Sequence, residues 1–391
     1  MLPVYFGQND IIHTVTGSPS GRHKADVVIE DYQGKYNFAT SPFPALDSVY
    51  LSGVGYRFNL RNLFHNFSGF NLPVPSNSQL LPEAVKGNIV KVKVRVQSVG
   101  TIALYENISN VFAILNGGMS ESDFAKLGNL FFDIWSQVKG PFLTWQPKTK
   151  RVEIQSPEHL YWLQNIVNAE IAITIRYTIN RLTFNGVGYV NATTVIDKTL
   201  AVKAYEMACI PVRPEIVRQL DSNIDPISIR NITVQVIYAA TNYLSEIRDF
   251  KVFDTSKGSG SPFSMAANSD TPIYLKILNS FGVWDTLRLY GKLKMSTETE
   301  RYTVSYERRM SLLDVEGFDL LEANTGSLDQ DWLRYMKQLL YARKIYHLTP
   351  TGNRELILET KKLPTFETNV GDENATFEFR YVEQNSNYSN L

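Results

Sequence analysis

PIYLKILNSFGVWDTLRLYG, residues 272–291, decides the fold class that we expect for this chain. From Ile273, every second residue is apolar over three positions, which is the period of a strand with one buried face. Asn279 and Gly282 then indicate a turn, because both residue types tolerate the positive φ angles of tight turns. A second strand begins at Trp284. The stretch therefore predicts a β-hairpin in which Asn279 and Gly282 are structural turn residues.

The second strand of this hairpin has two interpretations. A two-residue period places Trp284, Thr286, Arg288 and Tyr290 on one face. In the structural interpretation, Trp284 is a core residue and Asp285 caps the turn. In the alternative, Trp284 stacks on a sugar ring, Asp285 hydrogen-bonds the sugar hydroxyls, and Arg288 is a further ligand or interface contact.

Two strings in the chain resemble a known family. Residues 278–288, followed by Gly291, read L-N-S-x-G-x-W-D-T-x-R, while residues 142–147 and 157–160 read FLTWQP and PEHL. Both strings resemble segments of tail structural proteins encoded by phages and prophages of Bacteroidetes. This chain departs from the family pattern at Val283, where a second glycine is expected. The resemblance supplies no catalytic residues.

The resemblance implies a non-enzymatic virion protein of the phage tail, near the tail tip or baseplate, made in the bacterial host cytoplasm. Such a protein acts by assembling with copies of itself into a ring, sixfold by analogy with distal tail proteins, and by docking other tail proteins. One alternative is a receptor- or carbohydrate-binding module of the same particle that contacts a host surface glycan. The second alternative is a glycan-degrading tail enzyme with two carboxylates far apart in sequence.

Composition limits the classes of partner. Lys plus Arg and Asp plus Glu both number 39, so the formal net charge is zero. Binding to nucleic acid or to anionic membranes usually needs a basic excess, so neither is expected. Near-zero charge also removes the repulsion between copies. The aromatic content of 12% favours β structure and contact surfaces.

Cysteine usage and hydropathy indicate where the chain folds. Cys209 is the one cysteine, so no internal disulfide is expected, as in a reducing cytosol. The start, MLPVYFGQND, lacks a basic segment followed by an apolar run, and we expect no signal peptide. No stretch approaches 18 uninterrupted apolar residues, so we expect no membrane insertion.

The pattern along the chain predicts a mainly β protein of two antiparallel sandwich or barrel domains, each with one amphipathic helix. Residues 1–25 show little period and are expected to form an extended arm. The first domain is expected at 26–212 with a helix at 120–138. The second is expected at 213–391 with a helix at 327–342, where Ser327 and Gln330 form a capping-box pattern.

Three further features belong to this organisation. Valines alternate with cations from Val90 to Val96, which predicts a strand with one dry and one wet face. Residues 69–88 lack a pattern, and we expect them to reach a neighbouring subunit, so that deleting 70–86 leaves a folded chain but abolishes the ring. A proline followed four residues later by an arginine comes after each predicted helix, at Arg151 and Arg354, which suggests an internal duplication.

No catalytic or cofactor motif is present in the sequence. The five histidines do not have metal-ligand spacing, and one cysteine cannot form a structural zinc site. There is no phosphate-binding loop and no nucleophile elbow. The tetrapeptide GVGY occurs twice, ending at Tyr56 and Tyr189, and turns between strands explain both. We therefore expect no catalytic site, no cofactor and no metal.

Overall fold

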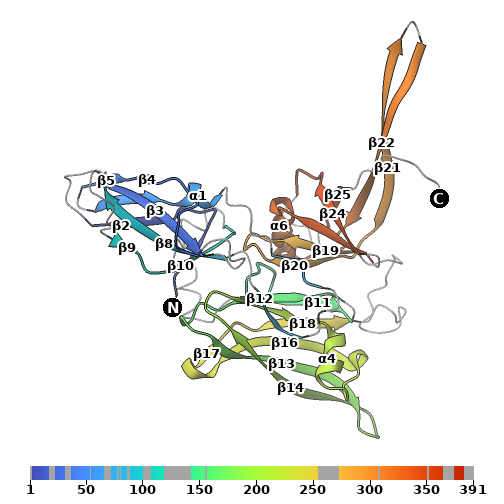
Figure 1. Ribbon diagram of the computed structural model, residues 1–391. Coiled ribbons are helices and arrows are strands. Elements are labelled where there is room, and N and C mark those ends of the chain that lie inside the picture. The colour runs from blue at the N-terminus through green and yellow to red at the C-terminus, as the bar shows by residue number, and fades with distance from the viewer. Residues whose placement is uncertain are drawn as a thin grey trace.

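The computed structural model describes residues 2–16, 23–30, 37–52, 54–65, 72–76, 79, 81–85, 89–99, 107–118, 142–154, 156–253, 273–306, 309–349, 352–363 and 374–382. Strands dominate these residues, and nearly all strand pairs are antiparallel, which confirms the mainly β fold class. Figure 1 shows three groups of strands along the chain. We call them the N-terminal unit (2–65 and 89–118), the middle unit (142–253, together with 83–85) and the C-terminal unit (273–382).

The N-terminal unit contains two sheets that face each other. The first sheet has the order β1-β10-β8-β3-β4, with β9 paired to β8. Its strands are β1 (Val4–Phe6), β3 (His23–Glu30), β4 (Leu46–Asp47), β8 (Ile89–Ser98), β9 (Asn107–Ile108) and β10 (Phe112–Leu115). The second sheet has the order β2-β6-β5 and comprises β2 (Ile12–Val15), β5 (Val49–Leu51) and β6 (Gly55–Asn59), which the short helix α1 (Arg61–His65) follows. One buried cluster joins Val27 and Val92 of the first sheet to Tyr56 and Phe58 of the second.

Strand β8 confirms the predicted dry and wet faces. Val90, Val92, Val94 and Val96 are buried, whereas the cations between them are partly exposed. The expectation of an arm at residues 1–25 is corrected, because β1 pairs in parallel with β10 and β2 pairs with β6. Strands of three and four residues are too short to show a period in the sequence.

The middle unit is a sandwich of a large and a small sheet. The large sheet has the order β11-β18-β16-β13-β14, with β17 paired to β16, and the small sheet has the order β12-β15-β7. The large-sheet strands are β11 (Thr149–Glu153), β13 (Ile171–Phe184), β14 (Tyr189–Val202), β16 (Ile229–Tyr238), β17 (Tyr243–Leu244) and β18 (Arg248–Phe253). The small sheet contains β7 (Glu83–Val85), β12 (His159–Leu163) and β15 (Met207–Pro211). The helices are α4 (Pro214–Leu220) and the 3-10 turns η2 (Pro226–Ser228) and η3 (Ala239–Thr241).

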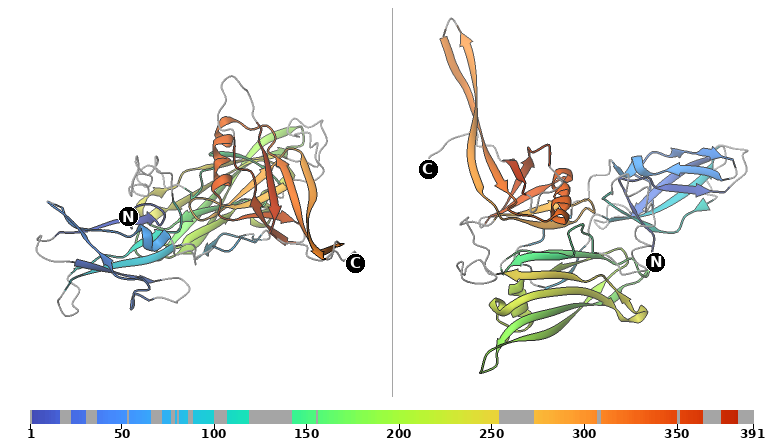
Figure 2. Two further views of the ribbon diagram at one scale, coloured as in Figure 1. Left: turned by 90° about the horizontal axis from the view of Figure 1, so that it is seen from above. Right: turned by 180° about the vertical axis from the view of Figure 1, so that it is seen from behind.

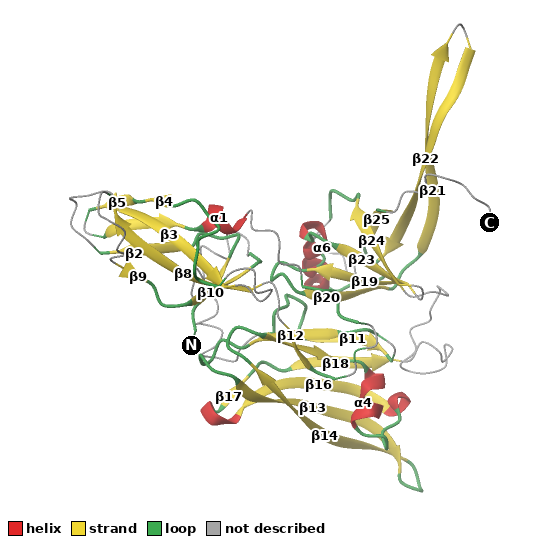
Figure 3. Ribbon diagram, viewed as in Figure 1, coloured by secondary structure: helices red, strands yellow, loops and turns green. Residues whose placement is uncertain are grey.

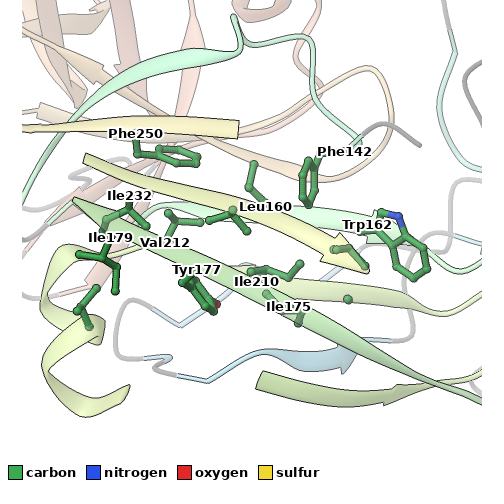
Figure 4. Close-up of a cluster of buried hydrophobic side chains, with 14 of the residues drawn as sticks. Phe142, Leu160, Trp162, Ile175, Tyr177, Ile179, Ile210, Val212, Ile232 and Phe250 are labelled. Carbon is green, nitrogen blue, oxygen red and sulfur yellow. The ribbon is translucent and has the colours of Figure 1, made fainter. Parts of the chain in front are cut away.

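The core of the middle unit lies between these two sheets. Figure 4 shows Ile175, Tyr177 and Phe250 from the large sheet close to Leu160 and Ile210 from the small sheet. The expected domain boundary at 212/213 falls inside this unit, because β13 pairs with β16 and β11 pairs with β18. Pro211 and Pro214 end a strand and begin a helix there, so the prolines indicate a change of element rather than a change of domain.

The C-terminal unit is built on a seven-stranded sheet with the order β20-β19-β23-β24-β25-β22-β21. Its strands are β19 (Ile273–Leu278), β20 (Trp284–Leu289), β21 (Leu293–Tyr306), β22 (Arg309–Asn324), β23 (Ile345–Thr349), β24 (Gly352–Leu358) and β25 (Thr376–Tyr381). Strand β22 pairs with β25 only over its last five residues, from Leu320 to Asn324. The rest of β21 and β22 pairs only with itself and projects as a two-stranded ribbon, seen from three sides in Figures 1 and 2.

The predicted helices have different outcomes. The helix expected at 120–138 lies outside the described residues. In the region 327–342, the structure has two short helices, α5 (Gln330–Tyr335) and α6 (Lys337–Tyr341), shown in red in Figure 3. Asp329, rather than Ser327, caps α5 by accepting a hydrogen bond from the Trp332 N–H at 2.9 Å. Both helices pack on the C-terminal sheet through Leu333, Tyr335 and Leu339.

Two other expectations are corrected by the strand pairing. Part of 69–88 packs on its own chain, because β7 pairs with β15 and Leu72 is buried. Deleting residues 70–86 would therefore remove core contacts. Arg151 lies in β11, which pairs in parallel at a sheet edge, whereas Arg354 lies in β24, an internal antiparallel strand. The two strands occupy unlike positions, which argues against the duplication.

Candidate functional site

The hairpin that the sequence predicts is present as β19 and β20. The two strands pair in antiparallel register from Ile273↔Leu289 to Leu278↔Trp284. Asn279 organises the turn, since its backbone oxygen accepts the Gly282 N–H at 2.9 Å and its side-chain oxygen accepts the Phe281 N–H at 2.9 Å. Gly282 has a φ of 74°, in the left-handed region that favours glycine. The predicted turn roles of Asn279 and Gly282 are confirmed.

Both faces of this hairpin are covered, which a two-residue period does not predict. Leu275 and Leu287 pack in the core of the C-terminal unit beneath α5 and α6. The tip of the hairpin packs in a different cluster, which contains Phe281 and Trp284 together with side chains from both other units. Those partners are Val4, Phe6, Ile89, Ala113 and Leu115 of the N-terminal unit and Leu143, Tyr161, Leu163, Tyr205, Met207 and Cys209 of the middle unit.

Trp284 is part of this cluster and is only 2% exposed. Its indole N–H donates to the backbone oxygen of Leu72 at 2.8 Å, and its ring lies 5.5 Å from that of Tyr346. A buried indole with its donor satisfied has no free face for a sugar. The structural interpretation of Trp284 as a core residue therefore holds, and the stacking interpretation is corrected.

Asp285 is also buried, and one carboxylate oxygen, Oδ2, accepts three hydrogen bonds. The donors are the Thr144 hydroxyl at 3.0 Å, the Asn279 side-chain amide at 2.9 Å and the Tyr335 hydroxyl at 2.9 Å. Burial raises the pKa of Asp285, while these hydrogen bonds oppose the rise. The carboxylate therefore joins the middle unit to the hairpin and to α5, and it is not a local turn cap.

On the other face of the hairpin, Lys276 is fully buried. Its Nζ donates to the Pro157 oxygen at 2.8 Å and to the Thr286 hydroxyl at 2.6 Å, and it lies 3.0 Å from Nδ1 of His159. Burial lowers the pKa of Lys276 to about 8. Burial, followed by the charge on Lys276, holds the pKa of His159 well below its usual range, so the imidazole is neutral near pH 7.

Ion pairs extend this contact along β20. Lys150 pairs with Glu158 at 2.8 Å, and both side chains are buried. The Lys150 ammonium also donates to the backbone oxygen of Thr286. Arg288 pairs with Glu153 of β11, so this predicted ligand contact is also engaged within the chain. The Arg288–Glu153 pair therefore joins the two units, and Lys150, paired within the middle unit, reaches across to β20 through Thr286, so that these buried charges have the partners that burial requires.

The two strings that carry the family resemblance meet in this contact. From FLTWQP, the Trp145 indole N–H donates to the Ser280 hydroxyl at 2.7 Å and the Leu143 oxygen accepts from the Asn279 side-chain amide at 2.9 Å. From PEHL, the Pro157 oxygen accepts from both Lys276 and Thr286. We call the set of buried polar side chains that join the middle and C-terminal units the polar junction. Its members are Thr144, Gln146, Lys150, Glu153, Glu158, His159, Lys276, Asn279, Asp285, Thr286, Arg288 and Tyr335.

The sequence did not identify Lys150, Lys276 or Tyr335 as members of this site. Lys276 lies at a polar position of an alternating strand, where a lysine usually indicates the wet face. Tyr335 lies on the apolar side of a helix, which predicts packing alone. No local signal in the sequence indicates that a second unit covers these positions, because their partners on that other unit are more than 100 residues away.

The polar groups of the junction mostly form hydrogen bonds and ion pairs with one another in a buried setting. Nε2 of His159 and Nε of Arg288 are buried without a hydrogen-bond partner among the described residues. Within the part of the chain that the structure describes, no group of three or more His, Cys, Asp or Glu side chains is arranged to hold a metal ion. Cys209 is buried, and burial raises the pKa of its thiol to about 11, which keeps it protonated near pH 7.

Comparisons with known proteins do not assign the chain to a family. No protein-family model matches it, and no curated protein matches it. One similar solved structure is the crystal structure of CBD12 from CALX1.2, with 10% identity, a TM-score of 0.17, and coverage of 60% of this chain and 76% of that one. Others are the plexin A4 extracellular region (8%, TM-score 0.17, 99% and 36%) and tripeptidyl peptidase 2 (8%, TM-score 0.14, 99% and 31%). None of these TM-scores is high enough to carry a functional argument.

Among the described residues, no helix combines the length and the apolar character that crossing a bilayer requires.

Proposed function

We propose that this chain is a non-enzymatic structural protein of a phage tail, near the tail tip or baseplate, that assembles with copies of itself and docks neighbouring tail proteins. The observation that carries the proposal is the polar junction. Both strings that resemble tail structural proteins lie in it, and hydrogen bonds between side chains and from side chains to backbone oxygens join one string to the other. Residues that hold the units of one chain together serve a structural purpose, and this is the role expected in a structural subunit of a particle.

The accessible surface provides a second line of support. A long ribbon extends beyond the C-terminal unit at β21–β22, and a short one extends at the end of β13–β14 beyond the pairing with β16; large apolar side chains are exposed on them, including Phe184, Val187, Tyr189 and Met295. Ribbons of this kind pay an ordering cost in isolation and gain stability from a neighbour. A zero net charge lets copies approach one another.

The structure weakens the reason for the carbohydrate-binding alternative. That alternative rested on Trp284, Asp285 and Arg288, and all three are engaged inside the chain. If a host glycan were bound through them, Trp284→Phe would abolish glycan-array binding by a protein that remains folded. We expect no binding to depend on Trp284, and a glycan signal that this substitution removes would contradict our assignment.

Self-assembly is the property to measure first. Light scattering coupled to size-exclusion chromatography should give a mass several times 44.4 kDa, and negative-stain images should show closed rings, sixfold by analogy with distal tail proteins. A chain that remains monomeric at millimolar concentration would contradict the proposal. A sample that forms open filaments would retain self-assembly and exclude the ring.

A further inference from the structure

The turn between β13 and β14 presents an apolar tip to solvent. Phe184 is 63% exposed, Val187 95% and Tyr189 75%. Nothing lies within 4 Å of the position that a Cβ would take at Gly186 or Gly188. In Figures 1 and 2 this turn lies at the end of the middle unit that points away from the N-terminal unit. We call residues 184–189 the apolar tip.

Hydrogen bonds and a ring contact within the turn order the apolar tip. The side-chain oxygen of Asn185 accepts the Val187 N–H at 3.1 Å and the Gly188 N–H at 2.9 Å. The rings of Phe184 and Tyr189 pair edge to face with centroids 5.6 Å apart. A preorganised apolar group loses little conformational entropy on binding, which favours a role in contact.

The N-terminal unit has a cavity of about 190 Å³ that an apolar group of this size fits. Tyr5, Ile11, Ile12, Leu60, Val111 and Phe112 supply its apolar lining. An apolar cavity of about 150 Å³ is known to hold a benzene molecule, so this one has room for a valine side chain or an aromatic ring. It opens between β1, β2 and β10, on a different unit from the apolar tip.

We propose that the apolar tip of one copy inserts Val187 into this cavity on the next copy, with Phe184 and Tyr189 covering the rim. The proposal rests on the self-assembly proposed above and names its interface. Because the tip and the cavity are different surfaces on separate units, the contact is heterologous, and repeating it produces a ring or a helical array. A single exposed valine that enters an apolar pocket of a neighbour is a known cause of such assembly.

The polar edge of the cavity suits the Tyr189 hydroxyl. His13, Ser109 and Asn110 form this edge, and Nε2 of His13 is buried without a hydrogen-bond partner among the described residues. Burial lowers the pKa of His13, which favours the neutral ring with one nitrogen free to accept.

The area of the apolar tip is a substantial part of what a stable contact needs. Two largely exposed aromatic side chains and a nearly fully exposed valine offer on the order of 400 Å². A stable interface buries about 800 Å² on each partner. The tip therefore supplies about half of one side, with the remainder left to the strands beside it.

The first experiment compares two identical tetrapeptides. Val187→Asp changes the GVGY of the apolar tip, and Val54→Asp changes the other GVGY, where the valine is 49% exposed and outside the cavity lining. We expect Val187→Asp to reduce the assembled fraction in light scattering at least tenfold, and Val54→Asp to leave it unchanged. Tyr189→Phe should raise the dissociation constant on the order of tenfold if its hydroxyl meets His13.

The second experiment traps the contact covalently under oxidised glutathione. A sample that mixes Ile12→Cys chains with Val187→Cys chains should yield cross-linked dimers on a non-reducing gel, and a chain that carries both substitutions should yield a ladder. Val54→Cys in place of Val187→Cys is the control and should give neither, since native Cys209 is buried.

These outcomes separate the two proposals. Assembly that survives Val187→Asp, or cross-linking within Val187→Cys alone, would overturn the tip-in-cavity contact and leave self-assembly intact. A wild-type chain that stays monomeric and forms no ladder would overturn both.

Discussion

Two hairpins of this chain share their local chemistry and differ in what covers them. In β19–β20, Asn279 accepts turn N–H groups and Gly282 has a φ of 74°, while in β13–β14, Asn185 accepts turn N–H groups and Gly186 has a φ of 93°. Yet the first hairpin is buried on both faces, and the second ends in open solvent. The turn chemistry therefore sets the hairpin, whereas distant segments decide its environment.

The largest expected contrast comes from removing an aromatic side chain at each hairpin. Trp284→Ala should reduce the free energy of unfolding by about 4 kcal/mol, because it empties a packed site and leaves the Leu72 oxygen without its donor. Tyr189→Ala should change it by less than about 0.5 kcal/mol, because that ring is 75% exposed. Urea denaturation followed by circular dichroism measures both. Equal losses of unfolding free energy for Trp284→Ala and Tyr189→Ala would contradict the difference in burial between the two hairpins.

A second contrast concerns one carboxylate on each hairpin. Asp285→Ala should cost about 3 kcal/mol, since three buried donors lose their acceptor. Asp197→Ala on β14 removes an ion pair with Arg176 in which both side chains are more than 40% exposed, and should cost about 0.5 kcal/mol. Denaturant midpoints at one pH and salt concentration test the ratio. If Asp285→Ala reduced the free energy of unfolding as little as Asp197→Ala, water would have to reach the donors of the polar junction.

The third prediction is a pH dependence that belongs to the buried hairpin. The folded pKa of Lys276, about 8, lies below the ordinary lysine value of 10.5. Between these values the unfolded chain holds a proton that the folded chain has released, so stability rises with pH in this window. From pH 7.5 to 9.5 the gain is about 2 kcal/mol.

Lys276→Met is the variant that isolates this effect. It should remove the rise, while Cys209, whose thiol pKa burial raises to about 11 and the charge on Lys276 lowers, still has an opposing effect in both proteins. Denaturation at three pH values gives the two curves. Parallel curves for the wild type and Lys276→Met would show that this lysine keeps an ordinary pKa.

The smallest expected contrast is between the two turn glycines. Gly282→Ala places a side chain at positive φ inside a packed turn and should cost about 2 kcal/mol. Gly186→Ala has the same strain with open space around it and should cost about 1 kcal/mol. Differential scanning calorimetry can resolve the two transitions. A reversed order would mean that the β19–β20 turn is looser than its hydrogen bonds indicate.

These two hairpins also show how far the sequence predicts the structure. The alternation and turn residues of 272–291 predicted β19, β20 and the turn, and the valines of β8 predicted its buried face. The prediction failed where a second unit changes the environment, as at Lys276 and Asp285, whose partners lie more than 100 residues away. The domain boundary failed for the same reason, because β11 and β18 pair across it.

The candidate site residues show the same difference between roles set by neighbours in sequence and roles set by distant segments. Asn279 and Gly282 were identified correctly because a turn needs only neighbours in sequence. Trp284 had two interpretations since an indole serves a core or a sugar equally well, and only its burial decides between them. The exposure of Tyr189 beside the burial of Tyr56, at the ends of identical tetrapeptides, makes the same point.

The cluster around Trp284 contains residues from all three units, and this has a consequence for synthesis on the ribosome. The Trp284 indole and the Leu72 oxygen are 212 residues apart, and Thr144 and Asp285 are 141 apart. Contacts this distant close late, because loop closure must precede them. Until residues 273–289 emerge, Leu143, Tyr161 and Leu163 lack the side chains that cover them, so the nascent chain carries an apolar surface that invites chaperones or premature association.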